Sequence, residues 1–292
     1  MNFRTDLALE RRQMLGENLS GVKVREIQGE ETKTTVIDIV DKDAAQKLGK
    51  GIGRYITIEM KSFSDDAAAS GGRLEALTKS IASLLPKGDG VVLVAGVGNM
   101  SMTSDALGPR TSSMIFATRH IGDEMRKAAG FSHKLRPVAT VSTGVLGQTG
   151  IESGEYIKSI CGVVKPSCVI TIDALASGSV SRLGNTVQMS DTGISPGSGI
   201  GNSRLRIDEG FLGVPVIAIG VPTVVDSVCL ACELLGKDIN EIPDEISEKS
   251  GNLIVAPKDV DLLVKNASFL IALAINCALQ PELTPEELYA LM

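Results

Sequence analysis

Aromatic residues are scarce in this chain: they make up 3% of its 292 residues, and tryptophan is absent. The core must therefore be largely aliphatic, and few rings are available to stack on bases or sugars. Histidine is also rare, since the chain has two, His120 and His133, and no His-Glu-x-x-His string. The sequence thus lacks the usual ligand set of a zinc hydrolase.

Basic residues are in deficit, because 35 acidic residues outnumber 29 basic ones and give a formal net charge of −6. This balance argues against nucleic acid as a direct ligand. No cationic start followed by an apolar run marks a signal peptide, and the apolar run 267–279 is too short to span a bilayer. Five cysteines, an odd number, fit a reducing compartment. We therefore expect a cytoplasmic protein that does not enter a membrane.

The rest of the chain alternates between strand-like and helix-like segments joined by short glycine-rich links. Strands are expected at 34–40, 54–60, 91–94, 135–141, 168–173 and 214–220, and helices at 73–85, 112–129, 151–161, 222–235, 259–279 and 285–292. Such alternation is typical of a parallel sheet covered on both faces. We predict an α/β protein with three layers, α/β/α, and a mostly parallel sheet. The polar residues 1–29 are expected to be a frayed terminus with a short helical pattern.

One stretch, 91–110, organises this prediction. Its apolar start reads as a buried strand, and the glycines of the Gly96-Val-Gly-Asn99 turn let the backbone come close to the strand end, because glycine has no Cβ. Asp105 follows on the next loop, with no lysine or arginine beside it in sequence. Sites in open α/β sheets form outside the carboxyl ends of strands. Asp105 therefore lies where chemistry is expected.

A second predicted strand, 168–173, also ends in an aspartate, Asp173, which follows Asp105 by 68 positions (173 − 105). That separation is long enough for two strand–helix units, so both carboxylates can reach one edge of one sheet. A single aspartate at such a place more often caps a turn or a helix. Its repetition makes the pair candidate catalytic residues.

Other motif matches in the sequence lack a residue or group that the corresponding chemistry requires. Gly193-Ile-Ser-Pro-Gly197 fits the Gly-x-Ser-x-Gly string of serine hydrolases, but Pro196 has no N–H for an oxyanion hole. The string 96–101 lacks the third glycine of a dinucleotide-binding fingerprint. Cys229 and Cys232 lie in an apolar segment and are expected to be buried packing residues.

Several short blocks resemble one known family, the germination proteases of spore-forming bacteria, which degrade small acid-soluble spore proteins. The blocks run in one order through nearly the whole chain. They are Arg4-Thr-Asp-Leu-Ala8, Gly53-Arg-Tyr-Ile-Thr57, Gly98-Asn99, Ser104-Asp-Ala-Leu-Gly-Pro109, Thr118-Arg-His120, Gly147-Gln-Thr-Gly-Ile151, Asp173-Ala-Leu-Ala-Ser177, Asp191-Thr-Gly-Ile-Ser-Pro-Gly-Ser-Gly199 and Val221-Pro-Thr223.

The resemblance implies a fold similar to that of hydrogenase-maturation endopeptidases, a homotetramer, an inactive zymogen, and a location in the cytoplasm of the forespore or spore core. It also implies an atypical aspartic-type endopeptidase that needs no cofactor and no metal, and that begins the degradation of small acid-soluble spore proteins. The family's two functional acids match Asp105 and Asp173. These are the two residues already chosen from the strand ends.

Two neighbouring carboxylates cannot both ionise easily, so such a pair holds one proton. One member can accept a proton from attacking water, and the other can polarise the peptide carbonyl and protonate the leaving amine. Further candidate site residues are Asn99 for the oxyanion, Arg110, Arg119 and Arg204 for acidic substrate residues, and His120 and Asp191 from the shared blocks.

The N-terminus contains a segment, Thr5-Asp-Leu-Ala8 followed by Leu9-Glu10, that looks like the acid-flanked site this family cleaves. We expect self-cleavage between Ala8 and Leu9, with residues 1–8 as a short propeptide and 9–292 as a single α/β protease domain. Two other functions stay open. One is a maturation-type peptidase guided by nickel, which the shortage of histidines disfavours. The other is a phosphate- or nucleotide-binding module that uses the loops at Gly96 and Gly197.

Overall fold

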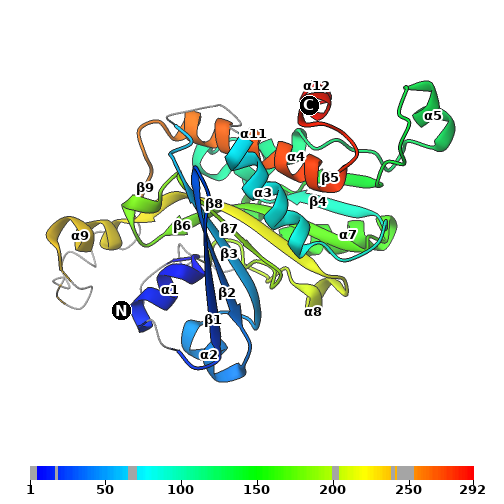
Figure 1. Ribbon diagram of the computed structural model, residues 1–292. Helices are drawn as coiled ribbons and strands as arrows, with labels where there is room; N and C mark the ends of the chain where they lie inside the picture. Colours follow the sequence, from blue (N-terminus) through cyan, green and yellow to red (C-terminus); the bar gives the residue numbers. More distant parts are fainter. Residues whose placement is uncertain (1–4, 17–18, 65–70, 199–203, 238–240, 242–252) are drawn as a thin grey trace.

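A twisted nine-stranded sheet forms the centre of the computed structural model, which describes residues 5–16, 19–64, 71–198, 204–237, 241 and 253–292 (Figure 1). The strand order is β1-β2-β3-β7-β8-β6-β4-β5, with β9 paired to β8. The strands are β1 (Val22–Gln28), β2 (Thr32–Ile39), β3 (Gly53–Met60), β4 (Val92–Gly96), β5 (Val138–Ser142), β6 (Cys168–Ser177), β7 (Thr186–Ser190), β8 (Val216–Asp226) and β9 (Ile254–Val255).

Thirteen helical segments are described around this sheet. They are α1 (Ala8–Leu15), α2 (Lys42–Leu48), α3 (Gly71–Leu84), η1 (Thr103–Asp105), α4 (Leu107–Ser113), α5 (Asp123–Ala128), α6 (Leu146–Thr149), α7 (Ser153–Val164), η2 (Val180–Arg182), α8 (Glu209–Leu212), α9 (Ser227–Leu235), α11 (Val260–Leu279) and α12 (Pro285–Ala290).

The α/β class is as predicted, but the sheet is mixed. Four neighbouring strands, β5, β4, β6 and β8, are parallel. The strands from β7 to β1 are each antiparallel to their neighbours. The alternating segments that suggested strands at 34–40 and 54–60 belong to this antiparallel part. The chain returns between them through α2 rather than through a hairpin loop.

Side chains of the parallel strands alternate between two cores, one on each face of the sheet. Val92 and Val94 of β4 pack in the core beneath α3, α4 and α11, whereas Leu93 and Ala95 pack in the core beneath α7. Figure 1 shows α3, α4 and α11 together along one face of the sheet. The three layers that the sequence predicted are therefore present.

Helix α11 is long and strongly apolar. Val260–Leu279 is long and apolar enough to cross a membrane, with a hydropathy of 1.8, but 72% of that window is buried inside the protein. A helix that is apolar on most sides belongs in a core. Its packing against α3 and α4 closes one face of the sheet.

Some element boundaries differ from the prediction. The segment 112–129 is not one helix, because α4 ends at Ser113 and a turn precedes α5. The helix expected from residue 222 begins at Ser227, because β8 continues to Asp226, which caps α9 through the N–H of Val228 at 2.9 Å. Strand β6 likewise continues past Asp173, with a register irregularity after Leu175.

The expectation of a frayed N-terminus is wrong for the described residues. Leu7, Ala8 and Leu9 are 0%, 2% and 4% exposed, and Ala8 and Leu9 pack in a small core with residues of β2, β3 and α2. Residues 22–28 form β1 at the edge of the sheet. The segment is polar on average, but Leu7, Ala8 and Leu9 are buried, whereas its apolar residues Met14, Leu15 and Ile27 are exposed.

Candidate active site

Asp105 and Asp173 line one cleft with a volume of about 350 Å³. Both lie beyond the end of β4: Asp105 closes η1, which follows β4, and Asp173 is the β6 residue after Ile172, the partner of Gly96. The amide of Val97 donates to the Ile172 carbonyl at 2.8 Å and keeps the two chains together there. The structure thus brings the two predicted aspartates to one edge of the parallel strands.

The loop that carries Asp105 is fixed by its own backbone. The amide of Asn99 donates to the Asp105 carboxylate at 2.8 Å and to the Asp105 carbonyl at 3.1 Å. Gly98 has a φ of +123°, and a Cβ there would lie 2.2 Å from the Asp105 carbonyl oxygen. Glycine is therefore required at this turn. Thr223 of β8 also donates to the Ser104 carbonyl at 2.7 Å and ties the loop to the sheet.

Asp173 is 4% exposed, and its Oδ1 accepts the amide N–H of Ala174 at 2.9 Å. Burial raises the pKa of Asp173 well above its ordinary value, and the negative charges of Asp105 and Asp6 raise it further. Burial also raises the pKa of Asp105, but the Asn99 amide N–H opposes that shift. The environments therefore favour the proton on Asp173 more strongly than on Asp105.

Asn99 and Arg204 also line the cleft. The Asn99 side-chain oxygen accepts the Ser101 amide at 2.9 Å and the Gln148 side-chain amide at 2.6 Å. With its oxygen used in this way, Asn99 has only its NH₂ group left to offer a substrate. Arg204 lies 3.9 Å from Glu152, measured between Nη1 and Oε1.

The structure does not bring Arg110, Arg119 and His120 to the cleft. Arg110 lines a separate cavity of about 910 Å³ between α3, α4, α11 and α12. Arg119 and His120 are exposed, and the Arg119 amide donates at 2.9 Å to Val138, the first residue of β5. Because β5 is parallel to β4, this is the edge of the sheet opposite to the aspartates.

Asp191 has a structural contact outside the cleft. It follows β7, and its carboxylate accepts the amide N–H of Arg54 at 2.7 Å. It thereby fastens the beginning of β3 to the end of β7.

Sequence reasoning missed Asp6 as a residue of this site. Its amide donates to the Ala176 carbonyl at 3.0 Å, and its carboxylate accepts the Ala176 amide at 2.9 Å and the Ser198 hydroxyl at 2.8 Å. Asp6 lines the cleft as a result. The likeness of residues 5–10 to a cleavage site was the signal that could have placed this segment near the aspartates. Arg4, in the same sequence block, lies outside the described residues.

Among the described residues, no three His, Cys, Asp or Glu side chains are grouped as a metal site would require. Cys229 and Cys232 are buried in α9, as expected of packing residues.

Comparisons with known proteins agree with one another. A family model described as germination protease matches residues 4–251. A germination protease of Caldanaerobacter subterraneus is 42% identical, covering 100% of this chain and 98% of that protein. Those of Clostridium perfringens and Priestia megaterium are 37% and 32% identical, covering 98% of this chain and 98% and 95% of those proteins.

A solved structure, the [NiFe] hydrogenase maturation protease HycI from Thermococcus kodakarensis, matches with a TM-score of 0.37 and 14% identity, covering 67% of this chain and 98% of that chain. The family match extends over most of the sequence and includes both cleft aspartates. The chain therefore belongs to the germination protease family and is a protease of spore germination.

Proposed function

We propose that the chain is an endopeptidase that starts the degradation of small acid-soluble spore proteins in the spore core. The observation that carries this proposal is the pair Asp105 and Asp173, which share one cleft and have raised pKa values. Carboxylates with unequal, perturbed pKa values are a recurrent arrangement for acid–base hydrolysis.

In the proposed mechanism, Asp173 is the protonated member and Asp105 the ionised one. Asp105 accepts a proton from the water that attacks the peptide carbonyl. Asp173 polarises that carbonyl and then protonates the leaving amine. Each positioned group of this kind contributes roughly 10²–10⁴-fold to the rate. The NH₂ group of Asn99, which lines the same cleft, is the proposed donor to the developing oxyanion.

The N-terminal segment supports the proposal of an inactive precursor. Asp6 is bound at Ala176, while Glu10 accepts hydrogen bonds from Ser177 Oγ at 2.9 Å and from the Gly178 amide at 2.8 Å. In an extended substrate, residues four positions apart lie about 13 Å apart. Here both acids bind within the three consecutive residues 176–178, because the segment is helical from Ala8 rather than extended.

We further propose that cleavage between Ala8 and Leu9 removes residues 1–8 and leaves a single protease domain, 9–292. Both residues are buried, and they begin α1. The Ala8 amide also donates to the Gln188 side chain at 2.6 Å. Self-cleavage therefore requires α1 to unwind at its first turn. From the family resemblance we also propose a homotetramer, which light scattering on the purified protein would test.

The decisive experiment incubates purified protein with a small acid-soluble spore protein and a chelator, and reads the fragments by mass spectrometry. Asp105→Asn and Asp173→Asn are expected to lose cleavage, and Asp191→Asn, outside the cleft, is the matched control that keeps it. Cleavage that survives either cleft substitution would remove the two-aspartate mechanism. The N-terminus of each sample is sequenced, because an intact Met1 marks the unprocessed precursor.

A further inference from the structure

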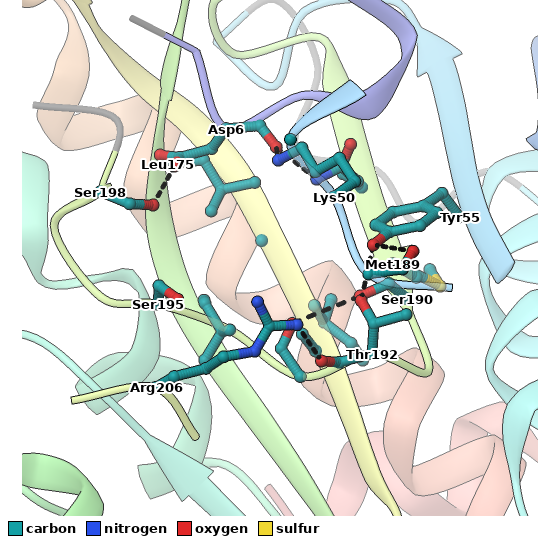
Figure 2. A pocket seen from close by; sticks show the side chains of 18 residues that line it. Asp6, Lys50, Tyr55, Leu175, Met189, Ser190, Thr192, Ser195, Ser198 and Arg206 are labelled. Atoms are coloured by element: carbon teal, nitrogen blue, oxygen red, sulfur yellow. Dashed lines mark hydrogen bonds between the residues drawn. The ribbon is translucent and has the colours of Figure 1, made fainter. Parts of the chain in front are cut away.

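A second cavity, of about 190 Å³, borders the aspartate cleft and shares Asp6 and Leu175 with it (Figure 2). Its floor is formed by β6, β8 and β7. Asp173 is paired with Gly220 of β8, and Gly220 is paired with Gln188 of β7. Asp173, Gly220 and Gln188 are therefore neighbours across three adjacent strands. The cavity extends the cleft from β6 toward β7.

The walls of this cavity carry two cationic side chains. Lys50 lies two residues after the end of α2, and Arg206 lies in the loop that follows β7. Their side chains approach the cavity from opposite sides (Figure 2). Hydroxyl groups lie between them: Thr192 Oγ1 is within hydrogen-bond distance of the Tyr55 hydroxyl, at 3.0 Å, and of Ser190 Oγ, at 3.3 Å. Two cations and several hydroxyls form a lining suited to an anion.

The cations are incompletely paired. Lys50 Nζ donates to the carbonyl oxygen of Asp6 at 2.6 Å, and within the described parts of the chain no carboxylate forms an ion pair with it. Arg206 uses Nε on Asp208 at 2.7 Å and Nη2 on the Thr192 carbonyl at 2.9 Å. Burial lowers the pKa of Lys50 to about 8, because an ammonium group withdrawn from water loses hydration free energy. A bound carboxylate would offset that loss.

The rim of the cavity indicates which anion enters. Asp6 belongs to the segment of this chain that looks like a cleavage site, and its carbonyl already contacts Lys50. Its carboxylate turns the other way, toward Ser198 and Ala176, so it does not fill the space between Lys50 and Arg206 (Figure 2). A polypeptide that crosses this rim in a more extended form would bring an acidic side chain to the two cations.

We propose that the cavity is a specificity subsite, in which Lys50 and Arg206 bind the carboxylate of an acidic residue of the polypeptide substrate close to the bond that is cut. This inference rests on the proposed endopeptidase function. It assigns acid recognition to two residues from loops that flank β3 and β7, rather than to Arg110 or Arg119.

The test uses processed full-length protein and matched peptides that carry either glutamate or glutamine beside the cleaved bond. The parent is expected to favour the glutamate peptide in kcat/KM by about tenfold or more. Lys50→Met and, from the opposite wall, Arg206→Gln are expected to reduce this preference toward unity by slowing the glutamate peptide alone. Lys50→Arg should restore it, and Lys47→Met, an exposed neighbour on α2, should keep the parent's preference.

A preference that survives in both Lys50→Met and Arg206→Gln would overturn the subsite while leaving the protease function intact. Failure of the processed parent to cut either peptide would refute the protease function and the subsite with it. Free glutamate and inorganic phosphate are added separately as competitors. Competition that depends on Lys50 but is equal for both peptides would mark a site for free anions and overturn the proposal.

Discussion

Asp6 and Ala176 form two hydrogen bonds, one from the Asp6 amide to the Ala176 carbonyl at 3.0 Å and one from the Ala176 amide to the Asp6 carboxylate at 2.9 Å. Ala176 lies three residues after Asp173 on β6. These two hydrogen bonds hold the N-terminal segment against β6, the strand that carries Asp173. The charge of Asp6 also contributes to the raised pKa of Asp173.

The first prediction concerns Arg182, which forms an ion pair with Glu10 of the N-terminal segment. Its Nε lies 3.4 Å from Glu10, and its Nη1 lies 2.7 Å from Glu59 of β3. Because the Arg182 and Glu10 side chains are 12% and 6% exposed, Arg182→Met leaves a nearly buried carboxylate without its cationic partner, although Glu10 keeps its hydrogen bonds to Ser177 and Gly178. We expect the free energy of unfolding to fall by about 3 kcal/mol and hydrogen exchange of residues 5–15 to accelerate.

The matched control for that prediction is Lys79→Met, which removes an exposed ion pair with Glu75 on α3. It should leave both measurements unchanged. Slow exchange of residues 5–15 in Arg182→Met would show that the remaining contacts, among them the Asp6–Ala176 pairing, hold the segment without Arg182.

A second prediction concerns the pH dependence of stability. The pKa of Asp173 is raised, so the folded protein keeps a proton that the unfolded chain releases above about pH 4. The parent therefore loses stability as the pH rises from about 4 toward the folded pKa. Asp173→Asn carries no charge and can still accept the Ala174 N–H. Its thermal stability should exceed the parent's by a margin that grows with pH, to about 1–3 kcal/mol at pH 7.

Thermal melts of Asp173→Asn and the parent between pH 4 and pH 8 test this sign. Asp191→Asn makes the same substitution at an exposed aspartate and is melted alongside as the comparison variant. A margin that shrinks as the pH rises would mean that Asp173 is ionised in the folded protein, and the proposed roles of the two aspartates would have to be exchanged.

The site and the sheet differ in how far they could be predicted. The parallel strands and the two aspartates follow from local features, namely apolar runs closed by an acid, and the structure places both residues in one cleft. Arg119 and His120 belong to a sequence block that resembles the family, but such a block does not tell which end of the strands its turn reaches. The Arg119 amide bonds to Val138 at the opposite edge.

The burial of the N-terminal segment could not be read from its own residues. Its mean polarity predicted a frayed end, yet the partners of Asp6 lie 170 and 192 positions away, at Ala176 and Ser198. Lys50 was not among the predicted site residues for the same reason. It stands in a glycine-rich turn, and only the fold brings that turn opposite Arg206. Such long-range contacts leave no periodic signal in a single sequence.

A third prediction follows from the ammonium group of Lys50. Its pKa is lowered to about 8 by burial, and it is further affected by the charges of Asp6, Arg11, Arg206 and Glu10. The ratio of kcat/KM for the glutamate peptide to that for the glutamine peptide should be constant below that pKa. It should fall as the pH rises through about 8, because the ammonium group loses its charge. A bound substrate carboxylate raises the pKa of Lys50. The corresponding fall in the ratio of kcat values should therefore come at a higher pH than the fall in the ratio of kcat/KM values.

Lys50→Arg separates this titration from other effects, because a guanidinium stays charged in this pH range. Its preference for the glutamate peptide should remain level from pH 7 to pH 9. If the parent's preference is equally level, Lys50 does not supply the charge that reads the substrate.

The last prediction concerns the turn that holds Asp105. Gly98 has a φ of +123°, and a methyl group there would come within 2.2 Å of the Asp105 carbonyl oxygen, which also accepts the Asn99 amide. Gly98→Ala must therefore displace the loop. We expect kcat to fall by about 10²-fold and the free energy of unfolding to fall by about 1–3 kcal/mol. Gly122→Ala is the matched control, because its φ is −75° and no atom lies within 4 Å of the added methyl group. Full activity in Gly98→Ala would mean that the conformation of the 98–105 turn does not position Asp105 for catalysis.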